Sequence, residues 1–233
     1  MGTIEEDGFL SEDIQEWIGK HRRENKDIFN LCSDLNTLCQ KLLLSLKPKK
    51  DDSQKVIVTI LFIRILSHFQ GINILTERGM LAEARSLLRG MLDATFAAVA
   101  LAKHQELVTE FVNDDHWQRL KCLNSFGNLP KKIKKRHRVG QNKLKELKES
   151  IQKEIDDKEI KPLTSEYLAR KADLLFYYNT LYVILSSSIH SRIRDMDQYF
   201  DEGDINEQEA LSFDLNPPPL VEDPERFYRS GVK

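Results

Sequence analysis

The stretch Leu181–Met196, LYVILSSSIHSRIRDM, decides the fold class because it joins a strongly apolar run to a serine triplet, a histidine and two arginines. It closes a segment from Ser165 to about Phe200 that contains no glycine or proline. A long apolar segment without helix breakers predicts a central helix. At about 100° per residue, Asn179, Ser186 and His190 share one polar stripe on this helix. We therefore expect a core helix whose stripe faces a buried polar cluster.

Two interpretations of His190 follow from this placement. A histidine in a core helix can be a structural residue that is hydrogen-bonded to a backbone carbonyl. It can also be a functional residue, acting as a general acid/base or binding a ligand, because imidazole titrates near neutral pH. The sequence leaves both open.

Arginines occur on the apolar side of a second expected helix, from Leu81 to about His104. Arg85 falls inside the apolar arc and Arg89 falls on its border. Asp93 follows Arg89 by four residues, a spacing that permits an ion pair on one helix face. A buried guanidinium needs a carboxylate, a carbonyl or an anionic ligand. The pattern is therefore compatible with structural pairing and with anion binding.

A third helix, expected from Gln54 to Glu77 with Gly79 as its C-terminal stop, carries Arg64 and His68 within FIRILSHF. These two residues also lie in nearly continuous apolar sequence. Three helices would thus bring arginine or histidine inward, which predicts a shared internal polar site.

The remaining apolar periodicity predicts further helices and no useful run of strand-like alternation, with the possible exception of residues 210–215. We expect an all-α protein with a single bundle domain of about six helices over residues 1–200. Residues 201–233 form an acidic, proline-containing extension that has too few apolar residues to build a core. The other expected helices are Ser11–Leu46, Glu106–Phe126 and Gln141–Asp157.

Composition narrows the function classes. The chain is 40% hydrophobic and 31% charged, with a net charge of -2, as in ordinary soluble proteins. Its apolar runs are shorter than the roughly 20 residues of a membrane span, so we predict no membrane contact. The three cysteines lack a CxxC pair and predict free thiols in a reducing cytoplasm. No phosphate loop, HExxH, GxSxG or zinc spacing is present, so we expect no metal and no cofactor.

One segment carries an excess of positive charge, whereas the whole chain is nearly neutral. Between Pro130 and Lys161 there are twelve Lys and Arg residues against six acids. The run KKIKKRHR can be a solvated surface or a contact to a phosphate backbone, which would be independent of base sequence and sensitive to salt. It lacks the interleaved aromatics that stack on bases. The candidate contact residues are Lys131, Lys132, Lys134, Lys135 and Arg136.

The stretches ERGMLAEARSLLRGMLDATFAAVALAKH and YYNTLYVILSSSIHSR together resemble a widespread bacterial family of unknown function, domain-of-unknown-function family 5677. The pattern is a glycine, a helix with A-x-x-L-x-R-acid character, and a late Y-x-x-L-S-x-x-x-H helix. Asp93 stands where the pattern suggests a glutamate. The resemblance covers about residues 57–199 and is carried by Gly79, Ala84, Arg85, Arg89, Asp93, Tyr182, Leu185, Ser186 and His190.

That family is similar in outline to HEPN helical proteins, many of which are metal-independent ribonucleases of toxin and phage-defence systems. Their mark is an arginine followed four to six residues later by a histidine on one helix. Arg64 and His68 have only three residues between them, and the arginines near His190 follow it.

The resemblance implies a bacterial defence or toxin-type effector that acts on RNA through an internal Arg/His site. His190 would be the general acid/base, and Arg85 and Arg89 would stabilise the transition state. The secondary candidates are Arg64, His68, Asp93, Ser186 and Asn179. The alternative is a non-catalytic helical interaction or sensor module whose polar cluster is structural or binds an anion. A homo-oligomer or a partner protein is compatible with either hypothesis.

Overall fold

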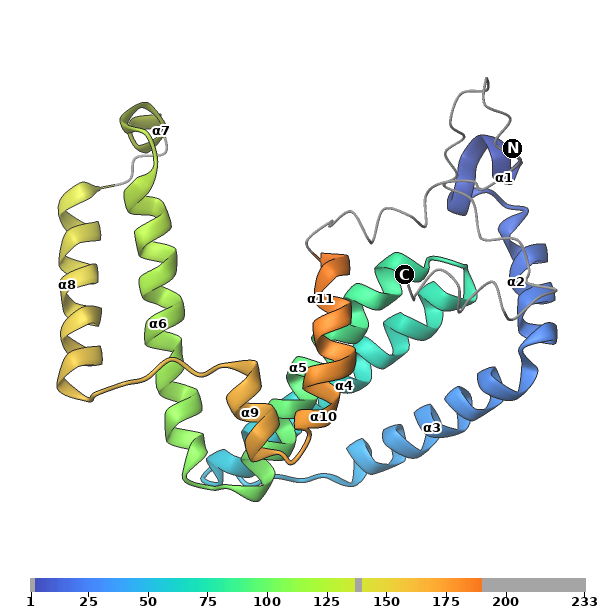
Figure 1. The fold of residues 1–233 in the computed structure, drawn as a ribbon, viewed down its shortest axis with the longest axis horizontal. Helices are drawn as coiled ribbons and strands as arrows, with labels where there is room; N and C mark the ends of the chain where they lie inside the picture. The colour runs from blue at the N-terminus through green and yellow to red at the C-terminus, as the bar shows by residue number, and fades with distance from the viewer. Residues whose placement is uncertain (1–2, 137–139, 190–233) are drawn as a thin grey trace. The chain divides into compact units, whose positions relative to one another are not determined.

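The computed structural model describes residues 3–136 and 140–189, and every regular element in that part of the chain is helical (Figure 1). The all-α prediction is confirmed for these residues. His190 and the predicted extension lie outside them. The elements are α1 (Ile4–Asp7), η1 (Gly8–Leu10), α2 (Ile14–Glu24), α3 (Lys26–Ser45), α4 (Ser53–Glu77), α5 (Leu81–Lys103), α6 (Leu107–Asn128), α7 (Lys131–Arg136), α8 (Gln141–Asp157), α9 (Ser165–Lys171), α10 (Leu175–Tyr177), η2 (Tyr178–Tyr182) and α11 (Val183–Ile189).

The helices form two compact units. Among the described residues, unit 1 comprises 3–49, 59–95 and 176–189, and unit 2 comprises 50–58, 96–136 and 140–175. The single bundle domain over residues 1–200, with a separate extension after it, stays a prediction. The largest fully buried side chains among the described residues are Phe96, Leu101 and Leu107, and all three belong to unit 2.

The first expected helix is two helices in the structure. The break lies at Asn25, whose backbone adopts φ -110° and ψ 32°. Its side-chain Nδ2 donates to the carbonyl oxygen of His21 at 3.1 Å, which satisfies a carbonyl in the last turn of α2. The apolar periodicity runs through the break, so periodicity alone could not locate it.

In unit 1, α4 and α5 approach closely at two glycines. A Cβ on Gly71 would lie 2.8 Å from Leu87 Cδ1, and one on Gly90 would lie 3.2 Å from His68 Nε2. Gly79 ends α4 as expected. It has φ 79°, its amide bonds to Thr76, and the next amide bonds back to Leu75, which is a Schellman arrangement.

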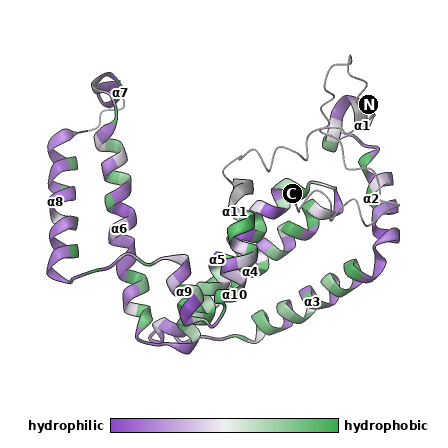
Figure 2. Ribbon diagram, viewed as in Figure 1, coloured by the Kyte–Doolittle hydropathy of each residue, from purple (hydrophilic) through white to green (hydrophobic). Residues whose placement is uncertain are grey.

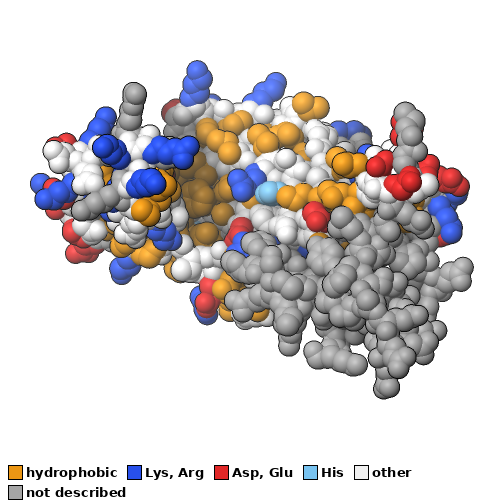
Figure 3. Space-filling model, turned by 90° about the horizontal axis from the view of Figure 1, so that it is seen from above, with side chains coloured by type: hydrophobic (Ala, Val, Ile, Leu, Met, Phe, Trp, Pro, Cys, Tyr) orange, Lys and Arg blue, Asp and Glu red, His pale blue; other side chains and the backbone are white. Residues whose placement is uncertain are grey.

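Hydrophobic side chains reach the surface in several places (Figure 3). On α4, Ile60, Ile63 and Ile74 are exposed. Within the described residues, α4 is the one helix whose length and apolar composition would allow it to cross a membrane, and core helices of soluble proteins meet the same criterion. The absence of membrane contact and the cytoplasmic location stay predictions.

Unit 2 contains a helical hairpin in which α6 and α8 lie side by side (Figure 1). Leu120, Ile155 and Ile160 form its core, and Trp117 and Ile151 pack against them. Trp117 Nε1 also donates to the carbonyl oxygen of Ile160 at 3.1 Å. The expected helix Gln141–Asp157 is confirmed with its bounds as α8.

The expected continuous helix from Ser165 is wrong. The chain leaves α9 at Asp173, which has φ 61°, and the Leu174 amide bonds back to Ala169 at 2.8 Å. A π-helical turn then occupies Tyr178–Tyr182. Because a π turn holds more residues than an α turn, it changes which side chains share a face. The polar stripe expected from uniform α-helical spacing is therefore interrupted.

Candidate functional site

The guanidinium of Arg89 is the centre of a polar cluster in unit 1. Its Nη1 donates to Asp93 Oδ2 at 2.6 Å, and its Nη2 donates to the Tyr182 hydroxyl at 2.5 Å. Its Nε donates to Ser186 Oγ at 3.3 Å. Each of its three nitrogens thus has a partner within the chain. We refer to Arg89, Asp93, Tyr182 and Ser186 as the Arg89 cluster.

Helical spacing explains how the cluster forms. Arg89 and Asp93 are four residues apart on α5, and Tyr182 and Ser186 are four apart on the η2–α11 segment, so each pair shares one face. Ser186 Oγ also donates to the carbonyl oxygen of Tyr182 at 2.8 Å, which directs its lone pairs to Arg89. The Tyr182 ring lies under the guanidinium, with its centroid 4.4 Å from Arg89 Cζ. This is the geometry of a cation–π contact.

The Arg89 cluster joins two helices that are far apart in sequence. Tyr182 and Leu185 are buried at 7% exposure each, while the Arg89 and Asp93 side chains keep 24% and 34%. The ion pair with Asp93 offsets the charge of the half-buried guanidinium, and the Tyr182 and Ser186 hydroxyls accept the hydrogen bonds of its other two nitrogens. The contacts therefore fix α11 on α5. Sequence reasoning placed Arg89, Asp93 and Ser186 at the site. It named Tyr182 only as one of the residues that carry the family resemblance, although its i−4 spacing to Ser186 could have placed it at the site as well.

Arg64 and His68, the candidate pair on α4, differ in exposure. Arg64 is exposed, so the expectation that it faces inward is not met. His68 packs against Gly90, and its buried Nε2 has no hydrogen-bond partner among the described residues. Burial, and secondarily the positive charge of Arg64, lowers the pKa of His68 below its ordinary value. His68 is thus a packing residue on the α4–α5 interface.

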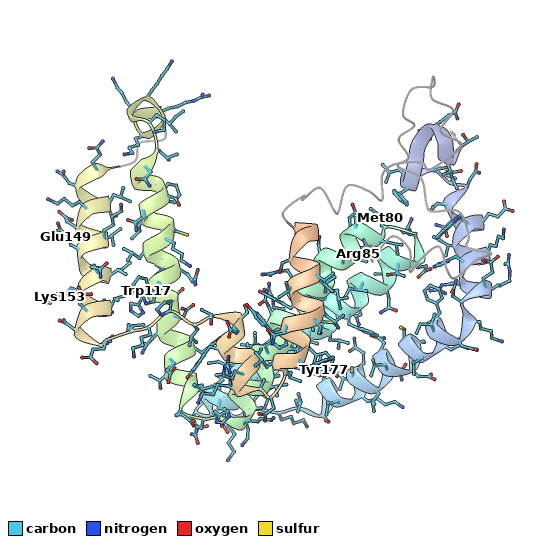
Figure 4. All side chains as sticks on the ribbon, in the orientation of Figure 1. Met80, Arg85, Trp117, Glu149, Lys153 and Tyr177 are labelled. Carbon is cyan, nitrogen blue, oxygen red and sulfur yellow. The ribbon has the colours of Figure 1, made fainter. Side chains whose placement is uncertain are left out.

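Arg85 lies one turn before Arg89 and lines a different feature. It borders an open hollow of about 170 Å³ between α4 and α5. Figure 4 shows Arg85 on α5 near the end that follows Met80. The other lining residues are Ile72, Thr76, Leu81, Ala84 and Leu88. The hollow is therefore mostly apolar with one guanidinium.

Two further residues, Asn179 and His190, were expected on the same polar stripe as Ser186. Asn179 lies in the π-helical turn and is exposed. His190 lies outside the described residues, four positions after Ser186 in the sequence. The hydrogen bonds of Arg89 join α5 to the η2–α11 segment, and the shared internal site of three helices stays a prediction.

The basic run forms a short helix, α7, between the two long helices of the unit 2 hairpin. Lys132, Lys135 and Arg136 are exposed and form no ion pair with any residue in 3–136 or 140–189. Lys134 is half-buried, and its Nζ donates to the carbonyl oxygen of Gly127 at 2.5 Å. The side chain of Lys131 is not among those described. We call Lys131, Lys132, Lys134, Lys135 and Arg136 the basic tip.

A histidine–carboxylate pair holds the same hairpin together. His116 Nε2 lies 2.9 Å from Glu154 Oε2, and its Nδ1 lies 3.0 Å from the carbonyl oxygen of Asn113. The hydrogen bond from His116, with help from Lys158, lowers the pKa of Glu154. No group of three or more His, Cys, Asp or Glu residues in the described part of the chain could hold a metal ion.

The features described above all lie within one stretch of the chain that matches a known protein family. A family model described as "Family of unknown function (DUF5677)" matches residues 55–208. The chain belongs to this family. The DUF5677 match includes the Arg89 cluster, His68, the hollow and the basic tip, and it begins after α3 has ended. No curated protein and no solved structure matches the chain.

Proposed function

We propose that this DUF5677 protein is HEPN-like in outline and acts on RNA, with the basic tip as its contact to the phosphate backbone. One observation carries the proposal. The exposed charges of Lys132, Lys135 and Arg136 have no carboxylate partner among the described residues. Elsewhere on the hairpin, Lys145 and Lys158 each pair with a glutamate four residues away. Unpaired cations are available to phosphates without first losing an internal ion pair.

The chemistry of the basic tip favours binding without base specificity. Lysine contacts phosphate as a point charge, and each such contact releases counterions from the nucleic acid. Aromatic side chains, which would stack on bases, are absent from α7. We therefore expect affinity to depend steeply on salt and weakly on base sequence.

The catalytic part of the proposal rests on His190 and comes from the resemblance. In this mechanism His190 removes the proton from a 2′-hydroxyl, whose oxygen attacks the adjacent phosphorus. The bond from phosphorus to the 5′-oxygen of the next nucleotide breaks, which leaves a 2′,3′-cyclic phosphate and a 5′-hydroxyl that takes its proton from water. Arg85 stabilises the charge that develops on the phosphate oxygens. Arg89 is better suited to positioning, because its three nitrogens are already bonded to Asp93, Tyr182 and Ser186. It would hold the segment that leads to His190. A role in bacterial defence, in a reducing cytoplasm, belongs to the same proposal.

A second candidate is a non-catalytic helical interaction or sensor module. The Arg89 cluster favours it, because a structural cluster is expected to be paired internally. Under this alternative, Arg89 and Asp93 serve only to dock α11 on α5.

RNA binding tests the proposal directly. The variant Lys132→Glu/Lys135→Glu/Arg136→Glu should bind a labelled single-stranded RNA at least about tenfold more weakly at 0.1 M salt. The slope of log affinity against log salt should flatten by about 2, because about 0.7 is lost per phosphate contact. The melting temperature should hardly change, since exposed charges contribute little to stability.

A matched control is available in the loop before α4. Lys47→Glu/Lys49→Glu/Lys50→Glu makes the same change in net charge at exposed lysines. Equal weakening by both triple variants, or no RNA binding by the parent protein, would contradict the role of the basic tip. His190→Ala in the same assays separates the two candidates. RNA cleavage should fall at least about 100-fold with binding retained if His190 is the acid/base, whereas binding without cleavage by the parent supports the second candidate.

A further inference from the structure

The helix α3 carries a regular apolar stripe. Ile28, Leu31, Leu35, Leu38 and Leu42 are separated alternately by three and four residues, as the a and d positions of a heptad are. Their exposures are 55%, 62%, 44%, 63% and 49%. All five side chains of the apolar stripe are thus exposed.

A different face of α3 packs against the rest of unit 1. Phe29, Cys32, Asn36 and Leu43 are half-buried, and they lie next to the stripe on the same helix. Asn36 Oδ1 accepts a hydrogen bond from Gln70 Nε2 of α4 at 2.9 Å. Since this contact fixes which face of α3 meets α4, the a/d stripe remains open among the described residues. Figure 2 shows hydrophobic residues recurring along α3.

The form of the stripe indicates its partner. A stripe confined to a and d positions is narrower than the face that a helix buries in a globular core, and it is typical of a seam between two helices. Leaving five large aliphatic side chains half-exposed forgoes their transfer from water, which is the dominant favourable term in association. The stripe therefore fits another helix with the same spacing.

We propose that α3 pairs antiparallel with α3 of a second copy of this chain. A two-fold axis at the middle of the seam places Leu35 opposite Leu38 of the second copy, and by symmetry Leu38 opposite the other Leu35. Leu31 then meets Leu42, and Ile28 meets Ser45. In this alignment, every large residue of the stripe lies opposite a residue of the second copy.

Charges beside the seam distinguish the two possible directions. Asp34 and Lys41 both occupy g positions, which flank the apolar layers. In the antiparallel alignment Asp34 lies beside Lys41 of the second copy, and this pair occurs twice. In a parallel, in-register pair, Asp34 would face Cys39 and Lys41 would face Leu46. Charge complementarity therefore favours the antiparallel pair.

The proposal does not depend on the RNA-binding proposal, because α3 precedes the residues matched by the DUF5677 model. The seam is shorter than the three to four heptads of a stable coiled coil, so we expect a dimer that dissociates on dilution. Pairing through α3 would place two copies of the family region in one assembly.

Sedimentation velocity of the full chain over a range of concentrations tests the pairing. The parent should shift from monomer to dimer as concentration rises. Leu38→Glu should remain monomeric throughout, because it places a charge in the seam. Leu44→Glu is the matched control: Leu44 is 79% exposed on the same helix but lies off the stripe, so this variant should dimerise like the parent.

A charge-reversal cycle tests the direction. Asp34→Lys and Lys41→Asp should each weaken dimerisation, because each places like charges side by side, and the double variant should restore it. Within one chain these residues are two turns apart, so restoration would have to come from the partner. A monomeric parent at every concentration, dimerisation by Leu38→Glu, or no restoration by the double variant would overturn the proposal.

Discussion

The α6–α8 hairpin and α3 are both built from amphipathic helices, but they differ in what their apolar faces meet. In the hairpin, Leu120, Ile155 and Ile160 are exposed by 8% or less. On α3, no residue is buried, although five large aliphatic residues form a stripe along it. Figure 2 shows the hydropathy of both regions. An amphipathic pattern thus defines a face without ensuring that the same chain covers it.

Polar contacts explain part of the difference. In the hairpin, Trp117 bonds to the Ile160 carbonyl, and Asp114 Oδ1 accepts from the Leu163 amide at 2.8 Å. These bonds, with the pair His116–Glu154, direct the chain after α8 back along α6. Between α3 and α4 the side-chain hydrogen bond is Asn36–Gln70. Directional bonds fix which faces meet, and apolar burial then follows.

Truncating one apolar side chain to alanine should show the largest difference in stability between the hairpin and α3. Ile155→Ala in the hairpin should lower the free energy of unfolding by about 2–5 kcal/mol, because it leaves a cavity among buried neighbours. Leu31→Ala on α3 should change it by about 0.5 kcal/mol or less at concentrations where the protein is monomeric. The tryptophans report on one unit each, since Trp17 is in unit 1 and Trp117 in unit 2. Each substitution is measured by denaturant titration in a background that keeps only the tryptophan of its own unit: Trp17→Phe for Ile155→Ala, and Trp117→Phe for Leu31→Ala. Equal losses of unfolding free energy in the two variants would contradict the difference between the hairpin and α3.

Removing the Arg89 guanidinium should have an intermediate effect, because unit 1 relies on polar contacts to dock α11. Arg89→Ala leaves Asp93 and Tyr182 without that partner and should cost about 1–3 kcal/mol. Hydrogen exchange should show faster exchange at amides 183–189, with the amides of α6 and α8 unchanged. Arg64→Ala, an exposed arginine on α4, should stay within about 0.5 kcal/mol of the parent. Unchanged protection of α11 in Arg89→Ala would show that apolar contacts alone hold it.

The smallest expected effect is the pH dependence of the hairpin. The pKa of Glu154 is lowered in the folded state from its ordinary value of 4.5, mainly by the hydrogen bond with His116. The unfolded chain therefore binds the proton more readily, so this contribution is present above pH 4.5 and is lost as pH falls through the folded pKa. Glu154→Gln should make the loss of stability below about pH 4.5 shallower. Glu146→Gln, on the same helix and without an ion pair among the described residues, is the matched control for the removal of one carboxylate.

Local sequence signals were sufficient for several elements. The helix Gln141–Asp157 and the stop at Gly79 both follow from local rules: periodicity for the helix, and the freedom of glycine to adopt positive φ for the stop. The Arg89–Asp93 pair also followed from spacing on a single helix. In each case the interaction that decides the structure spans only a few residues.

The break at Asp173 could not be predicted in this way. A non-glycine residue at φ 61° is unfavourable on local grounds. Here Lys103 Nζ binds Asp173 Oδ2 at 2.8 Å and the Ala172 carbonyl at 3.0 Å, so a partner 70 residues away stabilises the turn. The π-helical turn that follows changes the facing of the next side chains, which is why Asn179 is exposed while Ser186 reaches Arg89.

The sequence by itself determined that this protein is helical, where α4, α5, α6 and α8 begin and end to within about two residues, and which faces are apolar, because these properties depend on the preferences of neighbouring residues. The tertiary structure alone decided that the hydroxyl of Tyr182 completes the contacts of an arginine 93 positions earlier. It also decided that the stripe of α3 stays open while the faces of α6 and α8 close on each other. The physical reason is that many helix faces are compatible with burial, and only contacts between residues far apart in the chain select which faces meet.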